Sequence, residues 1–82
     1  MTTMNTLNLV LYSTDHCTMC EQALELLFSM PELQGFSLEV IDVGEDQALT
    51  ELYGERLPVL STGNTELDWP FDAKTVREAV AG

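Results

Sequence analysis

The 82-residue sequence predicts a single α/β domain, residues 1–82, with the element order β-α-β-α-β-β-α and a four-stranded mixed sheet. Two observations lead to this prediction. A nearly continuous apolar run at 7–12 is typical of a strand covered on both faces, and an apolar pattern with helical spacing follows it. The composition agrees, because 45% of the residues are hydrophobic, as in ordinary globular proteins.

A helix is expected at about residues 17–29. One face of it carries apolar side chains at the i, i+3, i+4 and i+7 positions of a 3.6-residue repeat: Cys20, Ala23, Leu24 and Leu27. Thr14 or Asp15 is expected to cap its N-terminus, because both side chains can accept hydrogen bonds from free backbone N–H groups. Pro31 and Gly35 are expected to end it.

The next segment, 36–41, alternates apolar and polar residues for most of its length, which is typical of a half-buried strand. With the strand at 7–12 and the helix between them, it predicts a right-handed parallel crossover unit. A shorter helix is expected around 46–53. We expect three of its side chains on the inner side: Leu49, Leu52 and Tyr53.

The remaining residues predict a hairpin and a final helix. The segment Leu57-Pro58-Val59-Leu60-Ser61 forms the third strand, with its proline near the start, where a missing N–H is tolerated. Thr62-Gly63-Asn64 is typical of a hairpin turn into a short fourth strand at about 65–67. The last helix is expected at about 72–80, with Asp72 as its N-cap.

The charge of the chain is strongly negative. Fourteen acidic residues stand against three cations, Arg56, Lys74 and Arg77, for a formal net charge of −11 at pH 7. Nucleic acids and anionic membrane surfaces both need a positive footprint, so we expect neither as a partner. The acidity also has an ordinary explanation, because net charge of this sign favours solubility.

The sequence carries no predicted export or membrane segment. No apolar stretch approaches the ~20 residues of a membrane helix, and residues 1–8 contain neither the basic region nor the apolar core of an export signal. We therefore expect a cytoplasmic protein, and a monomer. In the reducing cytoplasm a Cys-x-x-Cys pair is more often catalytic or metal-binding than a permanent structural disulfide.

The two cysteines, Cys17 and Cys20, stand between the first strand and the first helix. At the helix N-terminus the Cys17 sulfur would face unpaired backbone N–H groups and the positive end of the helix dipole, which favour the reactive thiolate. Cys20, one turn later, can then attack the mixed disulfide and release the product. We therefore predict a thiol–disulfide oxidoreductase acting on protein disulfides, with Cys17 as nucleophile and Cys20 as resolving thiol.

The charges around the motif work against the thiolate. Asp15 and Glu21 flank the cysteines, and no Lys or Arg stands near them in the sequence. Only His16, when protonated, would add a nearby cation. We therefore expect the Cys17 thiol to be less acidic than is usual for such sites.

Other interpretations of the cysteine pair stay open at this point. Both cysteines could simply pack at the start of a core-facing helix. One Cys-x-x-Cys offers two of the four ligands that zinc needs, so we predict no metal site within one chain, although a cluster shared between two chains stays open. From a different functional class, the domain could be a non-catalytic binding module that uses its proline-edged groove for a partner.

Three separated segments resemble a known family: 11–20 (Leu-Tyr-Ser-Thr-Asp-His-Cys-Thr-Met-Cys), 53–60 (Tyr-Gly-Glu-Arg-Leu-Pro-Val-Leu) and 69–72 (Trp-Pro-Phe-Asp). They are similar to the thioredoxin fold in its short glutaredoxin form, and more closely to small bacterial glutaredoxin-like proteins whose function is mainly unknown. The resemblance implies that Cys17 is the exposed nucleophile and Cys20 the resolving thiol.

The resemblance also implies a binding role for Leu57 and Pro58. Pro58 matches a proline whose preceding peptide bond is cis in this fold, which brings the Leu57 backbone beside the active sulfur. The N–H and C=O of Leu57 would then pair with a bound substrate like a short antiparallel strand.

The chain departs from glutathione-using glutaredoxins in two places. Thr18-Met19 stands between the cysteines where those proteins commonly carry Pro-Tyr, and a single Gly63 stands where they carry Gly-Gly. Glutathione is also an anion, which a protein this acidic repels within a Debye length of ~8 Å. We expect no firmly bound cofactor, and glutathione stays a candidate that the sequence disfavours.

Overall fold

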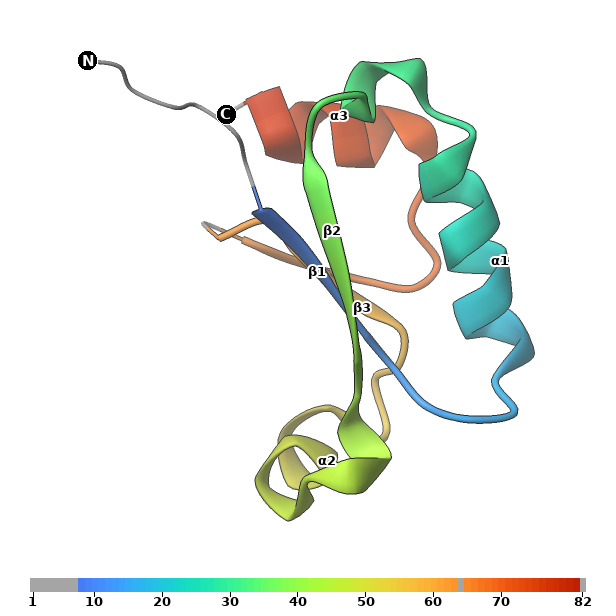
Figure 1. The fold of residues 1–82 in the computed structure, drawn as a ribbon, viewed down its shortest axis with the longest axis vertical. Helices are drawn as coiled ribbons and strands as arrows, with labels where there is room; N and C mark the ends of the chain where they lie inside the picture. The colour runs from blue at the N-terminus through green and yellow to red at the C-terminus, as the bar shows by residue number, and fades with distance from the viewer. Residues whose placement is uncertain (1–7, 64, 82) are drawn as a thin grey trace.

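The sheet of the computed structural model has four strands in the order β2-β1-β3-β4 (Figure 1). The structure describes residues 8–63 and 65–81. The strands are β1 (Asn8–Ser13), β2 (Ser37–Asp42), β3 (Val59–Ser61) and β4 (Glu66–Asp68). β1 pairs parallel with β2 and antiparallel with β3, and β3 pairs antiparallel with β4. The predicted α/β class, element order and four-stranded mixed sheet are confirmed.

The described residues also form three α-helices and two short 3-10 helices. These are α1 (Thr18–Phe28), η1 (Pro31–Leu33), η2 (Val43–Glu45), α2 (Gln47–Tyr53) and α3 (Ala73–Ala81). The sequence did not predict η1 and η2, because three residues are too few to show a hydrophobic period. Within residues 8–63 and 65–81, no helix has the length and apolar character to cross a membrane.

The helices pack on both faces of the sheet, with α1 and α3 on one face and α2 on the other (Figure 1). Successive side chains of a strand point to opposite faces. Leu11 of β1 therefore packs with Leu27 of α1 and Val76 of α3 in the larger core cluster. Tyr12, its neighbour, packs with Tyr53 of α2 in the smaller one.

The buried faces of the helices match the prediction in α1 but not throughout α2. In α1 the predicted inner residues Cys20, Ala23 and Leu27 are buried, and Leu24 is partly buried against the larger core cluster. In α2, however, Leu52 is 63% exposed, so its predicted inward position is wrong. Leu52 precedes the buried Tyr53 by one residue, which turns its side chain about 100° away around this seven-residue helix.

Local hydrogen bonding explains where β3 and α3 begin. β3 begins at Val59 rather than Leu57 because Pro58 has no N–H to donate to a sheet ladder. The Pro58 carbonyl still accepts a bond from the Trp69 N–H at 3.2 Å. At the start of α3, the predicted cap is confirmed, since the Thr75 N–H and hydroxyl both donate to Asp72 Oδ1 at 2.8 Å.

The hairpin between β3 and β4 turns through Gly63, whose φ of +96° favours glycine. The Thr62 N–H donates to the Thr65 carbonyl across this turn at 3.0 Å. Asn64, also predicted to belong to the turn, lies outside the described residues.

Candidate functional site

The two cysteines lie where the turn after β1 leads into α1 (Figure 1). Their Cα atoms are 5.1 Å apart and their sulfurs are joined in a disulfide. Cys20 is buried, with 2% of its surface exposed, whereas Cys17 is partly exposed. Solvent and a partner can therefore reach the first cysteine, while the second is sheltered by the core.

Cys17 is itself the N-cap of α1. Its backbone is extended, and its sulfur accepts a hydrogen bond from the Cys20 N–H at 3.1 Å. The predicted cap at Thr14 or Asp15 is wrong, because the turn through His16, whose φ is +57°, separates both residues from the first helical turn. At the start of α1 the Cys20 N–H, which has no partner within the helix, therefore donates to the Cys17 sulfur rather than to a side-chain oxygen.

A groove of about 490 Å³ opens beside the disulfide. One wall comes from the β1–α1 turn and the start of α1, and the other comes from the segment between α2 and β3. The residues that line it are Thr14, His16, Cys17, Thr18, Met19, Gly54, Glu55 and Leu57. The structure thus brings Leu57 and Cys17 to one groove although forty positions separate them in the sequence.

Leu57 and Pro58 have different surroundings. Pro58 is fully buried, and the peptide bond between the two residues is cis. Trp69–Pro70 is a second cis bond, which the sequence did not predict. Among the backbone hydrogen bonds of the described residues, none uses the N–H or C=O of Leu57. Both groups therefore stay available at the edge of the groove.

A cluster of aromatic and charged side chains fastens the second groove wall to the sheet. The Tyr53 ring stacks on Tyr12 with centroids 4.1 Å apart, and its hydroxyl donates to Glu66 Oε2 at 2.6 Å. Arg56 pairs with Glu66 at 3.1 Å and with Asp68 at 2.9 Å. These contacts hold the start and the middle of the segment that joins α2 to β3, and so fix the wall that faces Cys17.

The same contacts set the ionisation of this cluster. The Tyr53 hydroxyl, and then the Arg56 guanidinium, hold the pKa of Glu66 below its ordinary value of 4.5. The bond to Glu66, followed by burial, raises the pKa of Tyr53. Because Arg56 is bound by two carboxylates, its charge is compensated on the sheet and does not serve the groove.

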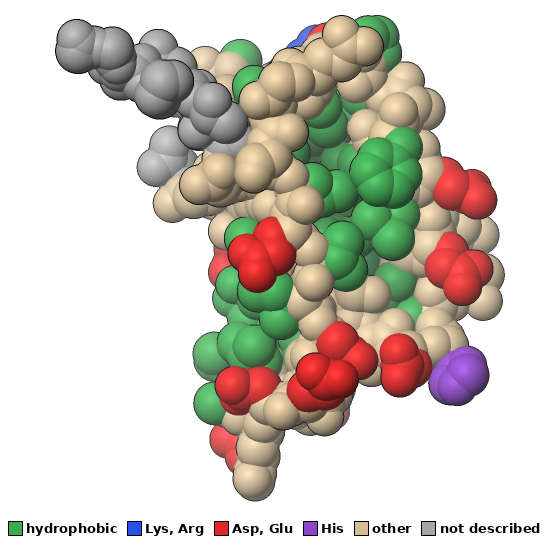
Figure 2. Space-filling view, viewed as in Figure 1, with side chains coloured by type: hydrophobic (Ala, Val, Ile, Leu, Met, Phe, Trp, Pro, Cys, Tyr) green, Lys and Arg blue, Asp and Glu red, His purple; other side chains and the backbone are tan. Residues whose placement is uncertain are grey.

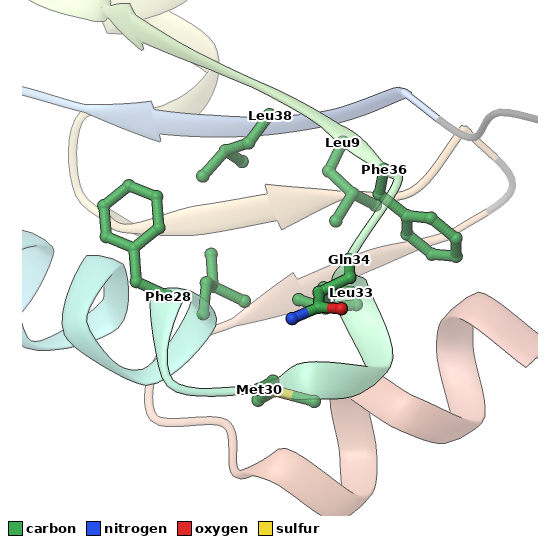
Figure 3. Close-up of a pocket in the computed structure, with 8 residues that line it drawn as sticks. Leu9, Phe28, Met30, Leu33, Gln34, Phe36 and Leu38 are labelled. Atoms are coloured by element: carbon green, nitrogen blue, oxygen red, sulfur yellow. The ribbon is translucent and has the colours of Figure 1, made fainter.

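A second cavity, of about 140 Å³, lies between the end of α1, η1 and the first residues of β1 and β2 (Figure 3). Leucine, phenylalanine and methionine side chains line it, and Gln34 is the one polar residue among them. None of the residues that line this cavity has a titratable side chain. Among residues 8–63 and 65–81, no three His, Cys, Asp or Glu side chains are grouped to hold a metal ion.

The glutaredoxin-like domain family (DUF836) matches residues 8–81, which include the cysteine pair and both groove walls. The chain belongs to this family. The resemblance seen in the sequence is thereby confirmed. Among curated proteins, none matches the chain.

Solved structures of two bacterial proteins are similar to this glutaredoxin-like chain. The X-ray structure of XcR50 from X. campestris has 38% identity and a TM-score of 0.76, covering 89% of this chain and 95% of that one. The solution structure of XcR50 has a TM-score of 0.73 at 38% identity, covering 89% of this chain and 91% of that one. The solution structure of Ne2328 from Nitrosomonas europaea has 30% identity and a TM-score of 0.77, covering 95% of each chain.

The predicted site residues of this glutaredoxin-like domain lie together, and the groove adds others. Cys17 and Leu57 line the groove, the buried Cys20 is bonded to Cys17, and the buried Pro58 follows Leu57 in the chain; their catalytic and binding roles stay predictions. The sequence did not predict that the wall residues Gly54 and Glu55 belong to the site. Both stand near Leu57 in the segment 53–60, and this closeness to a predicted binding residue is the signal that could have found them.

Gly54 holds a place in the groove wall that a larger residue does not fit. A Cβ at this position would lie 2.5 Å from the Thr50 carbonyl oxygen. We expect Gly54→Ala to lower the free energy of unfolding by about 1–3 kcal/mol, because backbone must move to admit the methyl group. Urea unfolding followed by circular dichroism measures this loss.

Gly44→Ala is the matched control for Gly54→Ala. A Cβ at Gly44 would lie 3.2 Å from Asp42 Oδ1, a side-chain atom that can move. We expect a loss of less than about 1 kcal/mol for this variant. Equal losses in the two variants would contradict the close approach at Gly54.

The Tyr53–Glu66 contact predicts a pH dependence of stability. Since the folded state lowers the pKa of Glu66, the ionised carboxylate stabilises the fold above the unfolded value near 4.5. This contribution is lost as the pH falls through the lower folded-state pKa. The difference in unfolding free energy between wild type and Glu66→Gln is therefore largest above about pH 4.5 and shrinks below it.

Urea unfolding of both proteins at a series of pH values tests this dependence. Glu78→Gln, at an exposed carboxylate of α3, serves as the control and should change stability by less than about 0.5 kcal/mol at neutral pH. A wild-type advantage over Glu66→Gln that stays constant down to about pH 3 would refute the assignment.

Proposed function

We propose that this glutaredoxin-like protein is a thiol–disulfide oxidoreductase that exchanges electrons between the Cys17–Cys20 pair and a disulfide of another protein. One observation carries the proposal: the partly exposed Cys17 sulfur lies at the N-terminus of α1 and accepts the Cys20 N–H at 3.1 Å. A donated N–H and the positive end of a helix both favour a thiolate over a thiol.

In the first step, the Cys17 thiolate attacks one sulfur of the substrate disulfide. A new S–S bond forms between Cys17 and that sulfur, while the old bond breaks and its electron pair leaves with the second substrate sulfur, which takes up a proton. The partly exposed position of Cys17 lets a substrate sulfur approach in line, and the open groove receives the rest of the substrate.

In the second step, Cys20 loses its proton and attacks the Cys17 sulfur. The Cys17–Cys20 bond forms, and the first substrate sulfur leaves with the electron pair and is protonated. Two electrons and two protons have then passed from the dithiol to the substrate. Because Cys20 is 2% exposed, external disulfides cannot reach it, which suits a residue that reacts only within the chain.

The substrate in this proposal is an extended segment of a protein. The unused N–H and C=O of Leu57 can pair with such a segment like a short antiparallel strand, and Met19, 49% exposed, offers it an apolar contact. No firmly bound cofactor takes part in either step. Leu57 acts through its backbone, so the identity of its side chain matters less than its position.

Reduction of insulin by dithiothreitol tests the proposal, with turbidity of the released chains as the readout. We expect the wild type to accelerate the reaction at least tenfold, and Cys17→Ser to leave only the background rate, because the attacking sulfur is gone. No acceleration by the wild type would refute the enzyme and favour a non-catalytic binding module.

Cys20→Ser, reduced beforehand and mixed with insulin in the absence of dithiothreitol, separates the roles of the two cysteines. Without its resolving thiol, Cys17 should accumulate as a mixed disulfide with an insulin chain, which intact mass spectrometry detects as a covalent adduct. An adduct that forms on Cys20 in Cys17→Ser, and not on Cys17 in Cys20→Ser, would reverse the assignment.

A further inference from the structure

The end of the molecule that carries the groove is surrounded by exposed carboxylates. Ser13 of β1 is paired with Asp42 of β2, so the loops that follow the two parallel strands emerge at the same end of the sheet. Acidic side chains gather at this end, next to the histidine (Figure 2). The exposed ones in these loops, in the first turn of α1 and in the adjoining short helices η2 and α2 are Asp15, Glu21, Glu45, Asp46, Glu51 and Glu55.

The cations of the chain do not compensate these charges. Arg56 is bound by Glu66 and Asp68 on the sheet, and Arg77 pairs with Glu32 at 3.2 Å. Lys74 belongs to α3, which lies at the far end of the molecule from the β1–α1 turn (Figure 1). Among the residues that line the groove, Glu55 carries a negative charge and His16 is the one basic side chain.

We propose that the preferred substrate is a disulfide in an extended protein segment that carries Lys or Arg beside its cysteine. This inference rests on the proposed function and names its substrate class. A segment paired with the Leu57 backbone would run along the groove, so the residues that flank its cysteine would pass near Glu55. The surrounding carboxylates would attract such a segment and repel anionic disulfides, glutathione disulfide among them.

Three disulfide-linked peptide dimers provide the test. Each strand has the sequence Gly-Xaa-Cys-Xaa-Gly with blocked ends, where Xaa is Lys, Gln or Glu, and oxidised glutathione is the fourth substrate. Reduced protein is mixed with each in single-turnover experiments, and the released thiol is measured after acid quenching. The rate at which dithiothreitol alone reduces each disulfide is also measured. Because dithiothreitol is uncharged, dividing the protein rate by this rate removes differences in the intrinsic reactivity of the disulfides.

We expect the Lys peptide to react about tenfold faster than the Glu peptide at low ionic strength, with the Gln peptide between them and oxidised glutathione among the slow substrates. The Lys-to-Glu ratio should fall to about twofold in 0.5 M salt, where the Debye length shrinks to a few ångströms.

Two charge-reversal variants test whether the preference for the Lys peptide arises at the groove. Glu55→Lys should lower the Lys-to-Glu ratio about threefold, because it replaces the carboxylate of the groove wall. Glu78→Lys makes the same change in net charge on α3, at the far end of the molecule, and should lower the ratio by less than about 1.5-fold.

Each result decides a separate point. Equal normalised rates for the Lys and Glu peptides at low salt, or equal effects of the two reversals, would overturn the inference and leave the proposed function standing. Peptide reduction by the wild type that is no faster than by Cys17→Ser would instead refute the proposed function, and the inference with it.

Discussion

The hydrogen bond between the Cys20 N–H and the Cys17 sulfur is the constraint on which the rest of the site depends. It requires that the helix begin immediately after Cys17, so the chain must leave β1 through a tight turn in which His16 adopts a left-handed conformation. The helical spacing that follows then places Cys20 against the core. The start of the helix at this point, together with its spacing, thereby separates an accessible cysteine from a sheltered one.

The second groove wall depends on contacts far apart in the sequence. Tyr53 and Arg56 bind carboxylates of β4, and this holds the connecting segment with Leu57 opposite the start of α1. The arrangement also has an electrostatic consequence. An arginine next to an active site would ordinarily favour a thiolate, but Arg56 is held on the sheet by two carboxylates. The proposed thiolate at Cys17 would therefore depend mainly on the helix N-terminus.

Hydrophobic periodicity and the cysteine spacing were enough to predict the order of the elements and the position of the cysteine pair, since both are local patterns. The cap of α1 was not predictable in the same way, because residue preferences favour the oxygens of Thr14 or Asp15 over a sulfur. The exposure of Leu52 depends on how α2 meets the sheet, which its own seven residues do not encode. Glu55 joins Cys17 in one groove only through the tertiary fold.

A thiol titration of the two single-cysteine variants, by absorbance of the thiolate near 240 nm, tests whether the helix end favours a thiolate at Cys17. We expect Cys17 in the Cys20→Ser variant to titrate below the ordinary cysteine pKa of about 8.5, because the backbone N–H of residue 20 and the helix end remain in place. Cys20 in the Cys17→Ser variant should titrate above that value, because burial disfavours its thiolate. The opposite order of the two pKa values would show that Cys20, and not Cys17, is the nucleophile.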